Sequence, residues 1–105
     1  MSYNLIVTKR ANELIDACIS YLLFRLKSGT GAEHLMQGIQ EIYTGLEENP
    51  YQYRISKDLF LAQKKYREAY IRGMKYKVIF RIEEPNMVYV LGLFHDLENY
   101  TEKID

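Results

Sequence analysis

The chain has 105 residues, of which 48% are hydrophobic and 27% charged, as in ordinary globular proteins. This apolar content excludes general disorder, and the length predicts a single domain over residues 1–105. Lys and Arg together number 14, as do Asp and Glu, so the formal net charge is zero and gives no support for binding to a polyanion.

The first half of the chain predicts a strand followed by a long helix. Residues 3–8, YNLIVT, are short, β-branched and apolar, which is typical of a strand. Thr8 is then a suitable N-cap for a helix over residues 9–27. Two apolar stripes lie side by side on this helix, one of Ile15, Cys18, Ile19, Leu22 and Leu26, the other of Leu14, Ala17, Tyr21 and Phe24. A helix with so much apolar surface is expected to contact more than one neighbour.

The remaining elements complete a β-α-α-β-β-β order. Residues 28–31, SGTG, predict a turn, and residues 32–49 a second helix that Asn49-Pro50 ends. Residues 51–65 show no clear period and predict a loop with one helical turn. Three strands follow, at residues 66–72, 75–84 and 87–95, joined by turns at Gly73-Met74 and Glu84-Pro85-Asn86. We therefore expect an α+β fold in which a helical hairpin packs on a curved antiparallel sheet.

Alternation along the last two strands assigns side chains to the faces of the sheet. One face of the strand at residues 75–84 carries Tyr76, Val78, Phe80 and Ile82, and the other carries Lys77, Ile79 and Arg81. On the last strand, one face is expected to carry Tyr89, Leu91, Leu93 and His95. One face must meet the helices, and the other, mixed face can carry cations.

Several kinds of site find no support in the sequence. The two histidines and the single cysteine, Cys18, are far apart and lack the spacing of metal ligands, and no glycine-rich phosphate loop is present. We expect neither a metal nor another cofactor. Cys18 alone cannot form an internal disulfide, and no stretch is apolar enough to cross a membrane or to serve as a signal peptide. These features favour a cytoplasmic protein without a membrane partner.

The segment KYREAYIRGMKYKVIFRIEEPNMVYVLGLFHDLENY, residues 65–100, resembles the RelE/ParE superfamily of toxins from bacterial type II toxin–antitoxin modules, which stabilise plasmids. An arginine opens the second strand of that family, here Arg67, and a strand similar to Tyr76–Ile82 follows it. The last strand of the family is apolar and ends in a histidine, here Val88 to His95. The N-terminal strand and the helical hairpin also fit, so the resemblance spans nearly the whole chain.

The resemblance implies a growth inhibitor that a small cognate antitoxin protein neutralises. RelE-like members cut mRNA on the ribosome, whereas ParE-like members poison DNA gyrase and need no nuclease residues. The long hairpin helices favour the ParE-like target, and His95 with Tyr100 favours the RelE-like one. The unusually apolar first helix suggests a surface for the antitoxin. The alternative is an inactive relative that serves as a protein-interaction module, for example as a homodimer.

Cleavage of RNA without a metal would need a base, an acid and a cation around one phosphate. Histidine titrates near neutral pH, arginine binds phosphate through its fork of donors, and tyrosine can stack on a base. The catalytic candidates are therefore His95, Arg81, Arg67 and Tyr100. We expect several of them to converge on the open face of the sheet, with Arg72 or Lys77 nearby.

Ordinary structural roles explain the same residues equally well. Arg81 and Lys77 are typical of the solvated face of an antiparallel sheet, and a histidine at a strand end often binds backbone. The acids Asp96 and Glu98 follow His95 directly and would repel a phosphate backbone. Together with the neutral net charge, these acids favour a protein target over RNA.

Overall fold

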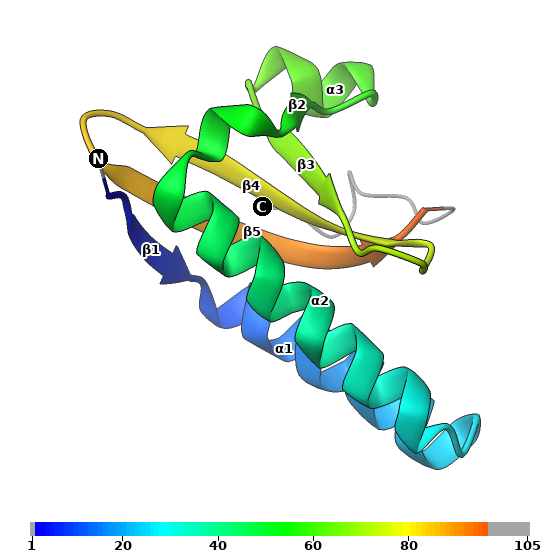
Figure 1. Ribbon diagram of the computed structural model, residues 1–105. Helices are drawn as coiled ribbons and strands as arrows, with labels where there is room; N and C mark the ends of the chain where they lie inside the picture. Colours follow the sequence, from blue (N-terminus) through cyan, green and yellow to red (C-terminus); the bar gives the residue numbers. More distant parts are fainter. Residues whose placement is uncertain (1, 97–105) are drawn as a thin grey trace.

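A computed structural model describes residues 2–96 as two layers, a five-stranded sheet and a helical hairpin that covers one of its faces (Figure 1). The strand order is β1-β5-β4-β3-β2. The strands are β1 (Asn4–Val7), β2 (Arg54–Ile55), β3 (Arg67–Tyr70), β4 (Tyr76–Glu83) and β5 (Met87–His95). The helices are α1 (Lys9–Ser20), its π-helical continuation η1 (Tyr21–Arg25), α2 (Gly29–Glu48), the 3-10 turn η2 (Pro50–Gln52) and α3 (Leu59–Gln63). The expected α+β class and the helical hairpin on a sheet are confirmed.

The first strand departs from the expected antiparallel sheet. β1 pairs in parallel with β5, so that Asn4 lies opposite Met87 and Val7 opposite Val90. The other neighbouring strands pair in antiparallel fashion. Parallel neighbours need a long crossover connection, and here the whole chain from α1 to β4 provides it. Nothing in a four-residue strand, NLIV, specifies the direction of its partner, so this pairing could not be predicted from the β1 sequence.

The two hairpin helices begin at side-chain caps. Thr8 Oγ1 accepts a hydrogen bond from Ala11 N at 3.1 Å, which confirms the expected N-cap of α1. Ser28 Oγ accepts from Gly31 N at 2.9 Å in the same way, so α2 begins at Gly29. The expected turn at residues 28–31 is therefore mostly the first turn of α2. Neither these helices nor any other in the described part of the chain is long and apolar enough to cross a membrane.

The main core lies between α2 and the sheet. Its fully or almost fully buried members include Leu35, Ile39, Ile42, Leu46, Val78, Phe80, Val88, Val90 and Leu93. α2 approaches the end of β3 so closely at Gly38 that a Cβ atom there would lie 2.6 Å from Ile71 Cγ2. A glycine at this position is what allows the helix to cover the sheet directly.

Part of the segment after α2 lies over the opposite face of the sheet. It contains the expected single helical turn, α3, and adds the short edge strand β2. Leu61 of α3 is fully buried against Ile79 and Phe94, which form a second, smaller core. The face away from the hairpin is thus partly covered, not wholly open as the sequence suggested.

A register shift in β5 changes which side chains share a face. Ile79 of β4 lies opposite Gly92, whereas its neighbour Phe80 lies opposite Val90, so Leu91 is an extra residue on β5. Alternation therefore reverses at this bulge. The expectation that Tyr89, Leu91, Leu93 and His95 share one face is wrong: the first two lie away from the hairpin, and the last two lie toward it.

Candidate functional site

The two candidate arginines lie on opposite faces of the sheet. Arg67 lies opposite Phe80 on the hairpin side, where its Nη1 donates to the carbonyl oxygen of Tyr53 at 2.6 Å. Arg81 points to the other side, because neighbouring residues of a strand alternate. There its guanidinium lies 4.1 Å from the centroid of the Tyr89 ring. The sheet itself therefore separates the two guanidinium groups.

His95 lies at the far end of the sheet from both arginines. It is paired with Tyr76, and the two rings meet edge to face with centroids 5.4 Å apart. Tyr76 precedes Phe80, the partner of Arg67, by four residues of β4, which is about 13 Å of strand. The structure thus does not bring Arg67, Arg81 and His95 together on one face. Tyr100 lies outside the described residues, and the catalytic roles of all four stay predictions.

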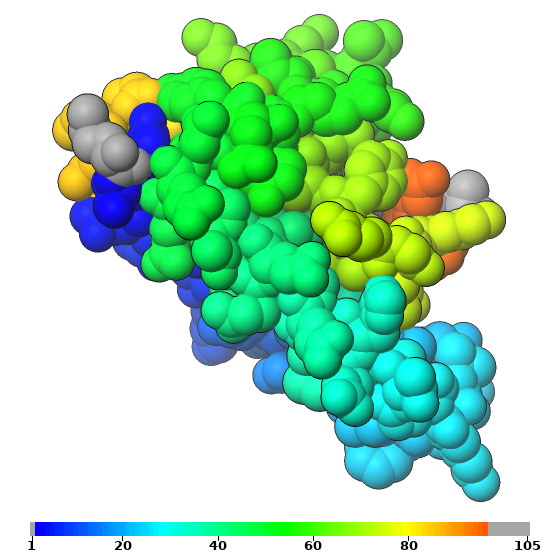
Figure 2. Space-filling view, in the orientation of Figure 1, coloured from blue at the N-terminus to red at the C-terminus, as the bar shows by residue number. Residues whose placement is uncertain are grey.

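A cavity of about 370 Å³ lies between α1 and the end of the sheet where His95 is found. Its lining consists of Leu14, Ala17, Cys18, Tyr21, Tyr76, Leu93 and His95. Three of these belong to the second apolar stripe of the first helix. The fourth member of that stripe, Phe24, is 72% exposed at the hairpin tip, which projects beyond the rest of the molecule (Figure 2). The end of the stripe at Tyr21 and Phe24 is thus exposed, whereas Leu14 packs against the second core.

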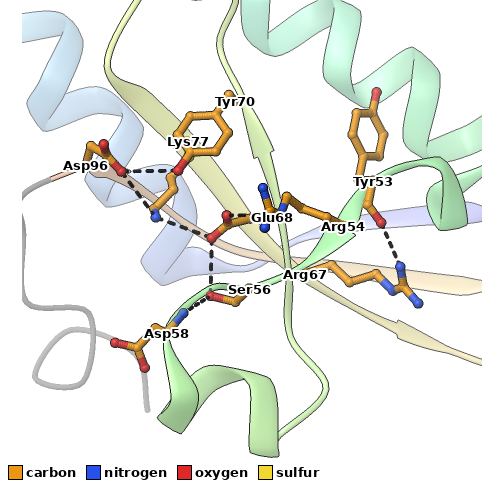
Figure 3. Close-up of polar contacts among 9 residues, drawn as sticks. All are labelled: Tyr53, Arg54, Ser56, Asp58, Arg67, Glu68, Tyr70, Lys77 and Asp96. Carbon is orange, nitrogen blue, oxygen red and sulfur yellow. Dashed lines mark hydrogen bonds and ion pairs between the residues drawn. The ribbon is translucent and has the colours of Figure 1, made fainter.

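A buried polar network lies on the face away from the hairpin (Figure 3). Lys77 Nζ lies 3.3 Å from Glu68 Oε1, and the two side chains are only 4% and 0% exposed. Ser56 Oγ also donates to Glu68 Oε1, at 3.2 Å. The other oxygen, Glu68 Oε2, has no hydrogen-bond partner in the described part of the chain, although Arg54 Nε lies 3.9 Å away. Lys77, which the sequence suggested as a phosphate ligand, is thus buried in an ion pair.

The same network engages the acid beside His95. Lys77 Nζ lies 3.4 Å from Asp96 Oδ1, and the Tyr70 hydroxyl donates to that oxygen at 3.2 Å. Burial alone would raise the pKa of Asp96, but the hydrogen bonds from Tyr70 and Lys77 outweigh it and hold the pKa below its ordinary value. Asp96 is therefore an ion-pair partner of Lys77. The sequence suggested only that Asp96 would repel a phosphate backbone, and did not predict this structural role.

A separate cluster of two tyrosines binds Glu84 at the turn between β4 and β5. The Tyr51 hydroxyl donates to Glu84 Oε2, and the Tyr3 hydroxyl lies 3.4 Å from both carboxylate oxygens. The hydrogen bond to the carboxylate raises the pKa of Tyr51 to about 12 from an ordinary value of 10.0. Because the neutral phenol is favoured in the fold, its contribution to stability is complete below pH 10.0 and is lost as the pH rises from there to about 12.

We expect Glu84→Gln to return the pKa of Tyr51 toward its ordinary value of 10.0, because the neutral amide favours the phenol less strongly. The measurement is an NMR titration that follows the Cζ chemical shift of Tyr51. Glu83→Gln is the matched control, since Glu83 pairs with Arg81 instead. An unchanged titration in Glu84→Gln would show that Glu84 is not the cause of the shift.

The net charge of zero conceals a strong segregation of charge along the chain. Residues 50–82 hold nine Lys or Arg and two Asp or Glu, for a net charge of +7. Residues 1–49 hold four basic and six acidic residues, and residues 83–105 hold one and six. The sequence interpretation considered only the total and missed this pattern, which a count in successive windows would have found.

The fold is similar to that of a solved structure described as "Chromosomal ParDE TA system from P. aeruginosa". The two share a TM-score of 0.70 over 90% of this chain and 96% of that one, at 19% sequence identity. At this identity the similarity establishes the fold alone. A comparison with curated proteins finds no match.

The sequence itself matches a family model. Residues 5–100 match the family described as "ParE toxin of type II toxin-antitoxin system, parDE". The match runs from β1 past the end of β5 and so includes the hairpin and every strand of the sheet. This match confirms the resemblance to the RelE/ParE superfamily and assigns the chain to its ParE branch. A toxin of such a system has an antitoxin as its partner. The chain belongs to the ParE toxin family of type II toxin–antitoxin systems.

Proposed function

We propose that this ParE-family toxin acts in the cytoplasm by poisoning DNA gyrase, and not by cutting mRNA. The observation that carries the proposal is the separation of Arg67, Arg81 and His95. Cleavage through the 2′-hydroxyl needs its base, acid and phosphate-binding cation around the same phosphate. These three side chains lie on two faces and at distant positions of the sheet. A toxin that poisons an enzyme by binding to it needs a complementary binding surface, and does not need a base, an acid and a cation around one phosphate.

The second candidate is a ribosome-dependent mRNA endonuclease. The position of His95 favours it, because this side chain lines a cavity beside the Tyr76 ring at the end of the last strand. In that reaction His95 would transfer the proton, Arg67 and Arg81 would bind phosphate, and Tyr100 would stack on a base. The candidate therefore requires a rearrangement that brings residues from both faces of the sheet to one phosphate.

Two assays on the purified toxin separate these targets. We expect it to inhibit supercoiling of relaxed plasmid by gyrase and to leave mRNA intact in a coupled transcription–translation extract, read by primer extension. Because His95 has no proton to transfer in gyrase poisoning, His95→Ala is expected to keep its inhibition of gyrase within about twofold of the wild type. His34→Ala, which removes the other histidine of the chain, is the matched control.

Codon-phased cuts in the mRNA that disappear in His95→Ala but not in His34→Ala would contradict the gyrase proposal and support the nuclease. Silence in both assays, together with unimpaired growth when the gene is induced alone, would favour the inactive interaction module. Rescue of growth by a small protein encoded in a neighbouring gene would identify that protein as the antitoxin.

A further inference from the structure

Four exposed or partly exposed cations of residues 50–82 lie on the face away from the hairpin, whereas Arg67 lies on the hairpin side with Lys65, and Arg72 lies beside α2. We use the term basic face for Arg54, Lys57, Lys64 and Arg81. Arg54 of β2 is paired with Glu68 of β3 and lies on this face, as does Arg81 of β4. Lys57 and Lys64 flank α3, which packs on the same face. All four side chains are exposed or partly exposed, whereas Lys77 beneath them is buried.

The acids on this side are few and already engaged. Glu68 is buried against Lys77, and Asp96 shares the same lysine. Asp58 accepts a hydrogen bond from Leu61 N as the N-cap of α3. Glu83 lies 3.2 Å from Arg81 and is the acid that most reduces the charge of the basic face. With Lys77 included, five cations thus stand against these four acids, and the two acids that share Lys77 are held beneath the exposed cations.

Aromatic rings alternate with the cations of the basic face. Lys64 Nζ lies 4.7 Å from the Phe60 ring centroid and 5.8 Å from that of Tyr66. Lys57 Nζ lies 5.6 Å from the Tyr70 ring, and Arg81 lies 4.1 Å from Tyr89. Surfaces that bind single-stranded nucleic acid combine these two elements, since cations follow the phosphates and rings stack on the bases.

We propose that the basic face binds a DNA strand, with its cations on the phosphate backbone and its rings available to unpaired bases. An acidic protein would use the same cations but would have no need of the rings beside them. The choice of DNA over RNA rests on the proposed function, because gyrase holds its DNA substrate with both strands cut. The toxin would then contact the DNA as well as the enzyme, on a face that α3 covers only in part.

The test is fluorescence anisotropy of the full chain with a labelled single-stranded DNA of about 20 nucleotides, longer than a typical single binding site. The variant Lys57→Glu/Lys64→Glu reverses two charges of the basic face. The matched control, Lys9→Glu/Lys27→Glu, makes the same change at exposed positions of the hairpin. We expect the first variant to lose affinity at least tenfold, with a salt slope smaller by about 2, and the control to stay within about twofold.

Three results would overturn the proposal: no binding to DNA at about 50 mM salt, an equal loss of affinity in both variants, or equally tight binding to polyglutamate of matched length. The last result would assign the basic face to an acidic protein. Melting curves followed by circular dichroism ensure that both variants are folded. Inhibition of gyrase is measured separately. If the wild-type toxin binds DNA but leaves gyrase active, the proposal that gyrase is the target is wrong, while the proposal that the basic face binds DNA stands.

Discussion

Replacing Lys77 by methionine is expected to lower the free energy of unfolding by about 3–5 kcal/mol, the usual cost of removing one partner of a buried ion pair. The side chain of Lys77 is only 4% exposed and links Glu68 to Asp96 across the sheet. Without it, the fully buried carboxylate of Glu68 loses its close cation, while Arg54 remains 3.9 Å away and largely exposed. Urea denaturation followed by circular dichroism measures the loss.

Two further variants show whether the buried charge is the cause. Arg54→Met removes the exposed member of the network and is expected to cost at most about 1 kcal/mol, as for surface ion pairs. The double variant Glu68→Met/Lys77→Met removes both buried charges and is expected to regain most of the lost stability. A double variant as unstable as Lys77→Met alone would assign the loss to packing instead.

Replacing Phe24 by alanine is expected to weaken the binding of the antitoxin by about 2 kcal/mol, or about thirtyfold in Kd, and to leave the stability of the toxin within about 0.5 kcal/mol. Phe24 is 72% exposed at the tip of the hairpin, so the free toxin gains little from its ring. The ring continues the apolar stripe that lines the cavity beside α1. We propose this stripe as the surface on which the antitoxin lays an apolar helix.

Isothermal titration calorimetry with the cognate antitoxin measures the change. Phe60→Ala is the matched control, because Phe60 is also exposed but lies on α3, which packs on the opposite face of the sheet. Unaltered affinity in Phe24→Ala would exclude the hairpin tip from the complex. A larger loss in Phe60→Ala would move the antitoxin to the face that we assign to DNA.

The elements with strong local signals could be predicted from the sequence. Residues 87–95 form β5 as expected, because a continuous apolar run bounded by a turn specifies a buried strand. Thr8 caps α1 because its hydroxyl needs only a neighbouring backbone group. The start of α2 was placed too late, since the glycines of SGTG resemble a turn while Ser28 acts as a cap. Local chemistry thus fixed the elements but not always their ends.

Features that depend on distant partners could not be predicted. The bulge at Leu91 is visible only against the register of β4, and it reverses the side on which His95 lies. Lys77 and Glu68 meet because a hairpin turn brings β4 beside β3, and no spacing along the chain reveals that one will bury the other. The residue types of the candidate site were therefore identified, while their separation on two faces became apparent only in three dimensions.

The parallel pairing of β1 with β5 has a consequence for when the sheet can be completed during synthesis. β1 precedes the other described strands along the chain, and the only strand it pairs with in the described sheet is the last one. Contacts between such distant parts of a chain form slowly, because the loop between them must close first. The described sheet therefore stays incomplete until synthesis has passed Val90, the last residue of β5 that pairs with β1.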